Sequence, residues 1–420
     1  MERLLVRGGK ALRGKVRISG SKNAILPIMA ASLMSSGEIV LKGVPCLEDI
    51  NVMSEALTIL GCSVKREQDV LIIRGGNVSH FELPEWISRR MRASNLVMGA
   101  LLARLKCSRI GLPGGCAIGS RPMDLHIKGF RSLGYEIKEE HGLLEGKAVM
   151  SPRAEQETML DVPSVGATEN IMMAAALTPG VHLIRNAARE PEIVDLQNFL
   201  NLMGARIKGA GADTICIQGV DKLTGAEYTP IPDRIEAGTF MIAAAISRGD
   251  VRVDNVIPEQ LHPLMSKLKE IGIEILPAAD HIRVKAQGIL KPADIKTMPY
   301  PGFPTDMQPQ TMTLLATIEG TSVVVETIFE NRFMHVQELR RMGADISLEG
   351  RVAIVRGSSD WQGANVESSD LRAGAALILA GIFAPGETCI GGLEHIDRGY
   401  EKIHIKLANL GADVERIANC

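Results

Sequence analysis

The segment from Leu112 to Pro122 has the composition of a reactive loop around a single thiol, that of Cys116. Three glycines and two prolines surround this cysteine. Glycine permits positive φ and close backbone approach, and proline fixes the ends of a loop. Arg121 follows five residues later, and a nearby cation favours the reactive thiolate. We therefore interpret Cys116 as a candidate reactive thiol, with an inert loop cysteine as the alternative.

Basic residues stand at the starts of several apolar segments that we predict to be helices. A helix start carries partial positive charge, so a cation there is unfavourable by about 0.3–1 kcal/mol. The cations are Lys22 after Ser21, Arg92 before Ser94, Arg234 after Asp233 and Arg372 after Asp370. Their recurrence indicates a bound phosphate or carboxylate, and Arg332 and Arg398 add cations in loops. Ion pairs with neighbouring acids are the alternative, above all for Arg234.

No other motif of known chemistry competes with these residues. The patterns GxxxxGK[ST], HExxH and DxDxDG are absent. The seven cysteines are an odd number without a CxxC pair, which supports neither a zinc site nor a disulfide framework. Reduced thiols indicate a cytoplasmic protein, and Cys62, Cys216 and Cys389 are expected in the core. We predict no metal and no cofactor.

A short phrase recurs six times and indicates a structural repeat. In each copy an amphipathic segment ends at a glycine, and an apolar residue of the next strand follows three residues later. The glycines, 68–73 residues apart, are Gly61, Gly134, Gly204, Gly272, Gly343 and Gly411. Helices are predicted over 49–60, 191–203, 258–271 and 333–342, each closed by a left-handed glycine. Each unit therefore reads helix, strand, amphipathic helix and two strands.

A second helix type, apolar on nearly every side, also recurs six times. The predicted helices cover 24–34, 94–105, 167–177, 237–247, 307–318 and 371–383. Their expected N-caps are Ser21, Ser94, Ser164, Asp233, Thr305 and the pair Ser368-Ser369. A helix that is apolar all round must be buried all round. Two clusters of three, with helices inside and sheets outside, would bury them; a run of ordinary α/β layers is the alternative.

Composition limits the classes of function. The 420 residues carry a formal net charge of −2, so no gross basic field indicates a nucleic-acid partner. The N-terminus lacks the apolar core of a signal peptide. The most apolar run, from Ala373 to Pro385, is too short for a membrane span. We predict neither nucleic-acid nor membrane partners.

Several motifs in order give the whole chain a specific resemblance. It resembles the UDP-N-acetylglucosamine 1-carboxyvinyltransferase family of enolpyruvyl transferases. The motifs include Ser21-Lys22-Asn23-Ala24, Met91-Arg92-Ala93-Ser94, Pro113-Gly114-Gly115-Cys116, Asp124-Leu125-His126, Ser164-Val165-Gly166-Ala167-Thr168, Phe303-Pro304-Thr305-Asp306-Met307, Phe329-Glu330-Asn331-Arg332 and His395-Ile396-Asp397-Arg398.

The resemblance implies a fold and a division of the chain. The fold would be two inside-out α/β barrel domains, each of three βαβαββ-type repeats. One domain would cover 22–230 and carry the cysteine flap. The other would join 1–21 to 231–420, with the active site in the cleft between the two.

The resemblance also implies a reaction. The enolpyruvyl group of phosphoenolpyruvate would move to the 3-hydroxyl of UDP-N-acetylglucosamine by addition and elimination, with release of phosphate, in peptidoglycan synthesis. Cys116 resembles the family's acid, which also forms a covalent adduct and is alkylated by fosfomycin, and Asp306 resembles the base. Residues expected to bind phosphoenolpyruvate are Lys22, Asn23, Arg92, Arg121, Arg372 and Arg398. Residues expected at the sugar nucleotide are Asn23, Arg92, Arg121, Pro122, Met123, Asp124, Leu125, Ser164, Val165, Gly166, Asp306, Ile328 and Phe329. No obligate protein partner is inferred.

Two other functions remain open at the level of sequence. A transferase acting on shikimate 3-phosphate would share the fold, but that enzyme does not use a cysteine in this flap. A non-catalytic relative that binds UDP-sugar is the second. Val162-Pro163 stands where some family members carry a basic residue, so a side-chain contact to the nucleotide is in doubt there.

Overall fold

A computed structural model of the chain describes residues 2–112, 118–119, 122–149 and 154–418. These fall into two compact units. Unit 1 comprises the described residues of Met1–Ser19, Ala117–Ser120 and Pro232–Cys420, and unit 2 those of Gly20–Cys116 and Arg121–Ile231. Of the cysteine segment, the described residues Ile118 and Gly119 group with unit 1. The division into domains 22–230 and 1–21 plus 231–420 stays a prediction.

Each unit contains three copies of one βαβαββ repeat, each with its own four-stranded sheet. The copies of unit 2 are β14 (Ala226–Tyr228), α1 (Lys22–Ala31), β3 (Glu38–Leu41), α2 (Glu48–Ile59), β4 (Ser63–Glu67) and β5 (Val70–Arg74); then β6 (Glu82–Leu83), α4 (Val97–Leu105), β7 (Cys107–Gly111), α5 (Asp124–Ser132), β8 (Tyr135–Glu140) and β9 (Leu143–Ala148); then β10 (Glu155–Met159), α6 (Val165–Ala176), β11 (Val181–Arg185), α7 (Pro191–Leu202), β12 (Arg206–Lys208) and β13 (Thr214–Gln218). The short helix α3 (Glu85–Arg90) follows β6.

The copies of unit 1 follow the same order. They are β2 (Arg13–Arg17), α8 (Arg234–Ile246), β15 (Asp250–Asp254), α9 (His262–Ile271), β16 (Glu274–Pro277) and β17 (His281–Lys285); then β18 (Ile295–Lys296), α10 (Gln308–Leu315), β19 (Thr321–Val325), α11 (Val336–Arg341), β20 (Asp345–Glu349) and β21 (Val352–Arg356); then β22 (Asn365–Glu367), α12 (Leu371–Phe383), β23 (Glu387–Gly391), α14 (Ile403–Asn409), β24 (Asp413–Ile417) and β1 (Arg3–Arg7). The turn α13 (Leu393–Ile396) lies between β23 and α14.

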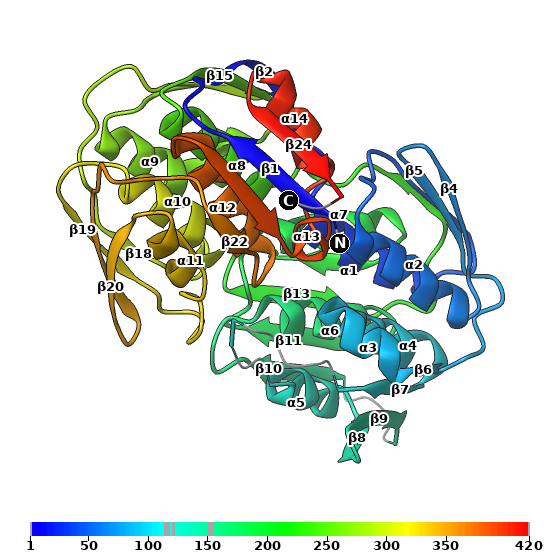
Figure 1. Cartoon of the computed structure of the whole chain (residues 1–420). Helices are drawn as coiled ribbons and strands as arrows, with labels where there is room; N and C mark the ends of the chain where they lie inside the picture. Colours follow the sequence, from blue (N-terminus) through cyan, green and yellow to red (C-terminus); the bar gives the residue numbers. More distant parts are fainter. Residues whose placement is uncertain (1, 113–117, 120–121, 150–153, 419–420) are drawn as a thin grey trace. The chain divides into compact units, whose positions relative to one another are not determined.

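The two chain ends meet in one sheet. The blue strand β1 lies between β23 and the red strand β24, antiparallel to both (Figure 1). The first residues of the chain thereby complete its last repeat. Two further strands are exchanged: β2 precedes α1 in sequence but pairs with β15 in unit 1, and β14 precedes α8 but pairs with β3 in unit 2.

The all-round-apolar helices lie inside the units, as predicted. In unit 1, α8, α10 and α12 pack against one another, and in unit 2, α4 packs against both α1 and α6 (Figure 1). The eleven consecutive residues 372–382 of α12 are all buried. Each unit has its own hydrophobic cluster. The alternative of ordinary α/β layers is therefore wrong, because helices occupy the centre where such layers would place a sheet.

The predicted glycine ends of the amphipathic helices are confirmed. All six repeat glycines have φ between +91° and +106°. At Gly204 a Cβ would meet no atom within 4 Å, so the left-handed backbone, rather than crowding, favours glycine there.

Three of the predicted N-caps are confirmed and three are wrong. Ser21, Ser164 and Asp233 accept hydrogen bonds from backbone N–H groups at the starts of α1, α6 and α8. Ser94 and Thr305 instead lie within the 3₁₀ turns Arg92–Leu96 and Thr305–Met307, which precede α4 and α10. The helical backbone therefore already includes these two residues, and neither stands at an N-cap. Asp370, not Ser368 or Ser369, caps α12 by accepting from the N–H groups of Arg372 and Ala373.

The cysteine predictions held in part. Cys62 is buried, and burial raises the pKa of its thiol to about 11. Cys216 is exposed, which corrects its assignment to the core, since its side chain points to the outer face of β13. Cys389 is buried in β23 but is disulfide-bonded, which departs from the expectation of reduced thiols. Within the described ranges, none of the helices has the length and apolar character needed to cross a bilayer.

Candidate functional site

The predicted site residues divide between the two units. Cys116 and Arg121 lie outside the described residues. Of the others, Asp306, Ile328, Phe329, Arg372 and Arg398 belong to unit 1. The remaining described residues belong to unit 2: Lys22, Asn23, Arg92, Pro122, Met123, Asp124, Leu125, Ser164, Val165 and Gly166. Each set is described by itself below.

Asp306 in unit 1 is held between two buried guanidinium groups. Nη2 of Arg332 donates to its Oδ1 at 2.7 Å, and Nη2 of Arg372 donates to its Oδ2 at 3.0 Å. The arginine side chains are 2% and 5% exposed, whereas that of Asp306 is 30% exposed. The two arginines thereby fix the orientation of the Asp306 carboxylate, whose oxygens, when it is ionised, can only accept hydrogen bonds.

A second carboxylate balances the charge of this cluster. Asp370, which caps α12, lies 4.0 Å from Nη1 of Arg332. Two cations and two anions are thus gathered at the starts of α10 and α12. Removing one member of such a buried group leaves an uncompensated charge, at a cost of about 3–5 kcal/mol.

A buried tyrosine anchors Arg372. Nη1 of Arg372 donates to the hydroxyl of Tyr400 at 3.1 Å, and Nε2 of Gln310 donates to it at 3.3 Å. Thr239 already donates its hydroxyl proton to the carbonyl of Ile235, so Tyr400 donates to Thr239 Oγ1 at 2.9 Å. The network draws one side chain from each of α8, α10 and α12. Burial lowers the pKa of Arg372, but Tyr400 and Asp306 raise it above its usual range overall, so the guanidinium stays charged.

The loop after β19 is fixed by a single carboxylate. Glu326 is buried and accepts hydrogen bonds from the N–H groups of Ile328 and Phe329, at 2.8 and 3.2 Å. It also accepts from the hydroxyls of Thr297 and Thr305, both at 2.9 Å. The backbone of this predicted nucleotide-binding loop is therefore preorganised next to Asp306.

Two residues of the cysteine segment are described, and they lie with this loop. The carbonyl of Ile118 accepts from the N–H of Asn331 at 3.0 Å. A Cβ at Gly119 would lie 2.7 Å from Oε2 of Glu330, so a larger side chain would displace this carboxylate. Arg398 is half-buried and lies in the turn after α13.

Lys22 in unit 2 forms a buried ion pair. Its Nζ donates to Oδ2 of Asp49 at 2.8 Å, and the two side chains are 12% and 4% exposed. Lys22 is the first residue of α1, and Asp49 lies in the first turn of α2. The cations at Lys22 and Arg372 are thus offset by acids distant in sequence. Arg234 lies over the ring of Tyr300, with 5.6 Å from its Cζ to the centroid.

The predicted nucleotide residues of unit 2 gather at two helix starts. Ser164 caps α6 by accepting from the N–H of Ala167. Met123 is buried before α5, and Nδ2 of Asn95 donates to its sulfur at 3.2 Å. Val162 is 59% exposed. An apolar side chain therefore faces solvent at the position where some family members carry a basic residue.

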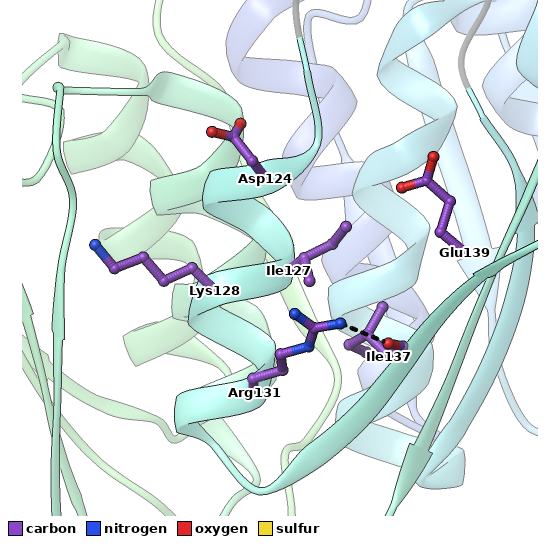
Figure 2. A pocket seen from close by; sticks show the side chains of 6 residues that line it. All are labelled: Asp124, Ile127, Lys128, Arg131, Ile137 and Glu139. Atoms are coloured by element: carbon purple, nitrogen blue, oxygen red, sulfur yellow. Dashed lines mark hydrogen bonds between the residues drawn. The ribbon is translucent and has the colours of Figure 1, made fainter.

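A surface pocket lies against the face of α5 that carries Asp124, Lys128 and Arg131. Its volume is about 430 Å³, and Figure 2 shows Asp124 and Lys128 on the helix opposite Glu139 of β8. Arg131 donates from Nη2 to the carbonyl of Ile137 at 2.9 Å. Only Asp124 is shared with the predicted nucleotide residues. The pocket is therefore not the predicted substrate site. Among the described residues, no three His, Cys, Asp or Glu side chains gather as a metal centre.

The chain matches known proteins over nearly its whole length. Residues 6–407 match the model of the EPSP synthase (3-phosphoshikimate 1-carboxyvinyltransferase) family. UDP-N-acetylglucosamine 1-carboxyvinyltransferase 2 of Carboxydothermus hydrogenoformans is 54% identical over 422 residues, covering 100% of both chains. The corresponding enzyme 1 of Caldanaerobacter subterraneus is 53% identical over 414 residues, covering 99% of both. The chain belongs to the UDP-N-acetylglucosamine 1-carboxyvinyltransferase family. The predicted resemblance is thereby confirmed.

Solved structures of this superfamily share the fold. The enolpyruvyl transferase NikO from Streptomyces tendae superposes with a TM-score of 0.89 at 24% identity, covering 99% of this chain and 98% of that one. EPSP synthase from Acinetobacter baumannii superposes with a TM-score of 0.76 at 20% identity, covering 99% and 100%. These likenesses confirm the predicted enolpyruvyl transferase fold.

Sequence reasoning missed four residues that position the candidate site. Asp49 and Glu326 are buried acids outside the quoted motifs, and Tyr400 lies two residues after the motif His395-Ile396-Asp397-Arg398. Arg332 was noted as a loop cation but not placed in the site. The signal available for Glu326 was its place directly after the apolar run Val323-Val324-Val325, whereas Asp49 stands between Glu48 and Ile50 without such a signal.

Proposed function

We propose that this protein transfers the enolpyruvyl group of phosphoenolpyruvate to the 3-hydroxyl of UDP-N-acetylglucosamine. The observation that carries this proposal is the 51–54% identity, over whole chains, to enzymes bearing that name. The sugar hydroxyl adds to C2 of phosphoenolpyruvate while C3 gains a proton. The resulting tetrahedral intermediate then loses the C3 proton and phosphate, which leaves the enol ether.

In unit 1, Asp306 would hold the attacking hydroxyl. The two arginines fix both of its oxygens from buried positions, which favours a carboxylate of defined direction over a mobile one. In this fixed orientation Asp306 would accept the proton of the 3-hydroxyl, the role that the resemblance implies for it. Arg398 would contact the phosphate or carboxylate of phosphoenolpyruvate.

In unit 2, Lys22 and Arg92 would supply further positive charge to phosphoenolpyruvate. Lys22 keeps its ammonium group next to Asp49, which holds it in a defined place. Cys116 would protonate C3, and Arg121 would bind the anion beside it; both remain predictions from the resemblance. The segments 122–125, 164–166 and 328–329 would contact the sugar nucleotide, through backbone groups above all, and Asn23 would contact the sugar.

Phosphate release with two acceptors tests the proposal. We expect release with phosphoenolpyruvate plus UDP-N-acetylglucosamine, and none with phosphoenolpyruvate plus shikimate 3-phosphate. Asp306→Asn should lower kcat at least a hundredfold, whereas Asp280→Asn makes the same change at an exposed side chain of unit 1 and should have no effect. Activity with shikimate 3-phosphate instead would reassign the substrate, and binding of UDP-sugar without phosphate release would indicate a non-catalytic relative.

The wider role follows from the reaction. The product would be a precursor of peptidoglycan, made in the cytoplasm, where phosphoenolpyruvate is available. We expect fosfomycin to alkylate Cys116, and mass spectrometry of the peptide spanning 110–121 measures this. An unmodified peptide after inactivation by fosfomycin would remove Cys116 from the proposed mechanism.

A further inference from the structure

Ser19 connects a buried ion pair of unit 1 to the turn that carries Arg398. It is the last residue of unit 1 before the chain passes to Gly20 in unit 2. Its backbone N–H donates to Oε2 of Glu236 at 2.8 Å, and Nζ of Lys406 donates to Oε1 of the same carboxylate at 2.6 Å. The side chains of Glu236 and Lys406 are 2% and 18% exposed. Ser19 is therefore held against a buried pair of charges.

The neighbours of the Ser19 hydroxyl determine the direction of its hydrogen bonds. Nζ of Lys406 lies 2.8 Å from Ser19 Oγ, and an ammonium group can only donate. Oγ therefore accepts from Lys406, and it donates its own proton to Oε2 of Glu401 at 3.0 Å. A hydroxyl that accepts from a cation and donates to a carboxylate makes two charge-assisted bonds, which are stronger than bonds between neutral groups. Glu401 is thereby tied to the pair of Lys406 and Glu236.

The turn between α13 and α14 is anchored near both of its ends. Asp397, at its start, accepts a hydrogen bond from Nη2 of Arg416 in β24. Glu401, near its end, accepts from Ser19. Arg398 lies between these two anchors. The backbone position of Arg398 therefore depends on both bonds.

The same turn packs closely on the start of α12, where Arg372 lies. A Cβ at Gly399 would lie 2.5 Å from Cδ2 of Leu371, so a larger residue would displace that side chain. The hydroxyl of Tyr400 accepts a hydrogen bond from Arg372. A shift of this turn would therefore move Arg398 relative to Arg372.

We propose that Ser19 is a positioning residue for Arg398. Its hydroxyl holds Glu401, and Glu401 holds the turn from which the Arg398 guanidinium reaches the phosphate or carboxylate of phosphoenolpyruvate. This inference rests on the proposed function, in which Arg398 binds that anion. An arginine binds such an anion best through two parallel N–H groups, and a small displacement misaligns both. Loss of the hydroxyl should therefore weaken the binding of phosphoenolpyruvate but not that of the sugar nucleotide.

Two variants of Ser19 and one control test this role. Ser19→Ala removes the bond to Glu401, and Ser19→Thr keeps a hydroxyl. With saturating UDP-N-acetylglucosamine, we expect the KM for phosphoenolpyruvate to rise about three- to tenfold in the Ala variant and to stay within about twofold of the parent in the Thr variant. The KM for UDP-N-acetylglucosamine should stay unchanged in both. Ser247→Ala, at a bonded hydroxyl at the C-terminal end of α8, should change neither KM.

A double variant tests the route through Glu401. If Ser19 acts through this carboxylate, Ser19→Ala should add nothing to the effect of Glu401→Ala on the KM for phosphoenolpyruvate, whereas independent effects would add in free energy. Fully additive effects would overturn the proposal. So would an unchanged KM for phosphoenolpyruvate in Ser19→Ala, or equal rises in both KM values. A hydroxyl that only pairs with Lys406 would lower stability and leave both KM values unchanged.

A further variant and the parent protein complete the test. If Ser19→Ala does not fold, Glu401→Gln decides, because it keeps the size of the side chain and removes its charge. It should raise the KM for phosphoenolpyruvate, and an unchanged value would overturn the proposal. A parent protein that releases no phosphate from phosphoenolpyruvate and UDP-N-acetylglucosamine would overturn the proposed function itself, whereas a failure confined to the variants leaves that function intact.

Discussion

Replacing His335 with glutamine should weaken the acid sensitivity of unit 1. His335 precedes α11 and is 1% exposed. Burial lowers its pKa from 6.5 to about 4; Asp370 acts in the opposite direction, and Arg332 lowers the pKa further. The folded unit therefore binds this proton less readily than the unfolded chain. The destabilisation is absent above pH 6.5 and grows as the pH falls toward 4.

The magnitude follows from the two pKa values. At about pH 5 the unfolded histidine is almost fully protonated and the folded one almost entirely neutral. The interval of about 1.5 pH units below 6.5, at 1.36 kcal/mol per unit, gives about 2 kcal/mol of lost stability. The His335→Gln variant should lose about 2 kcal/mol less than the parent between about pH 7.5 and pH 5.

Urea unfolding of unit 1 can be followed by one tryptophan. Of the two tryptophans, Trp361 is buried in unit 1 and Trp86 is 44% exposed in unit 2. A Trp86→Phe background therefore leaves fluorescence from unit 1 alone. His262, an exposed histidine of the same unit, provides the control His262→Gln, which should keep the full pH dependence. If His335→Gln and the parent lose the same stability, the reasoning from burial is refuted.

Three further substitutions test separate parts of the structure. Gly204→Ala should lower the free energy of unfolding by about 1–2 kcal/mol, because its φ is +106°, and Gly204→Asn by less; equal costs in urea titrations would contradict this. Tyr400→Phe should cost about 1–3 kcal/mol in calorimetry and lower kcat, since Arg372 loses its anchor; unchanged kcat would count against that positioning role. Asp49→Asn should cost about 3–5 kcal/mol, leaving Lys22 buried without its counter-ion; an unchanged melting temperature would refute it.

Much of the repeat architecture could be predicted from local sequence signals. A glycine that ends an amphipathic helix depends only on the few residues around it, and all six such glycines have the expected positive φ. The N-caps Ser21, Ser164 and Asp233 also act within one helical turn. Ser94 and Thr305 were misassigned because a 3₁₀ turn extended each helix start, and apolar periodicity does not distinguish that turn from the residues before a helix.

The sequence by itself determined the six repeats, the buried character of their central helices and the family, because these rest on spacing and on motifs in order. Only the tertiary structure decided which charges meet. Asp306 accepts hydrogen bonds from Arg332 and Arg372, which are 26 and 66 residues away in sequence. Lys22 donates a hydrogen bond to Asp49, which is 27 residues away. The local sequences of β2 and β14 likewise do not predict that β2 pairs with β15 and that β14 pairs with β3. Such pairings depend on how whole units pack, and no signal within one helix or strand encodes them.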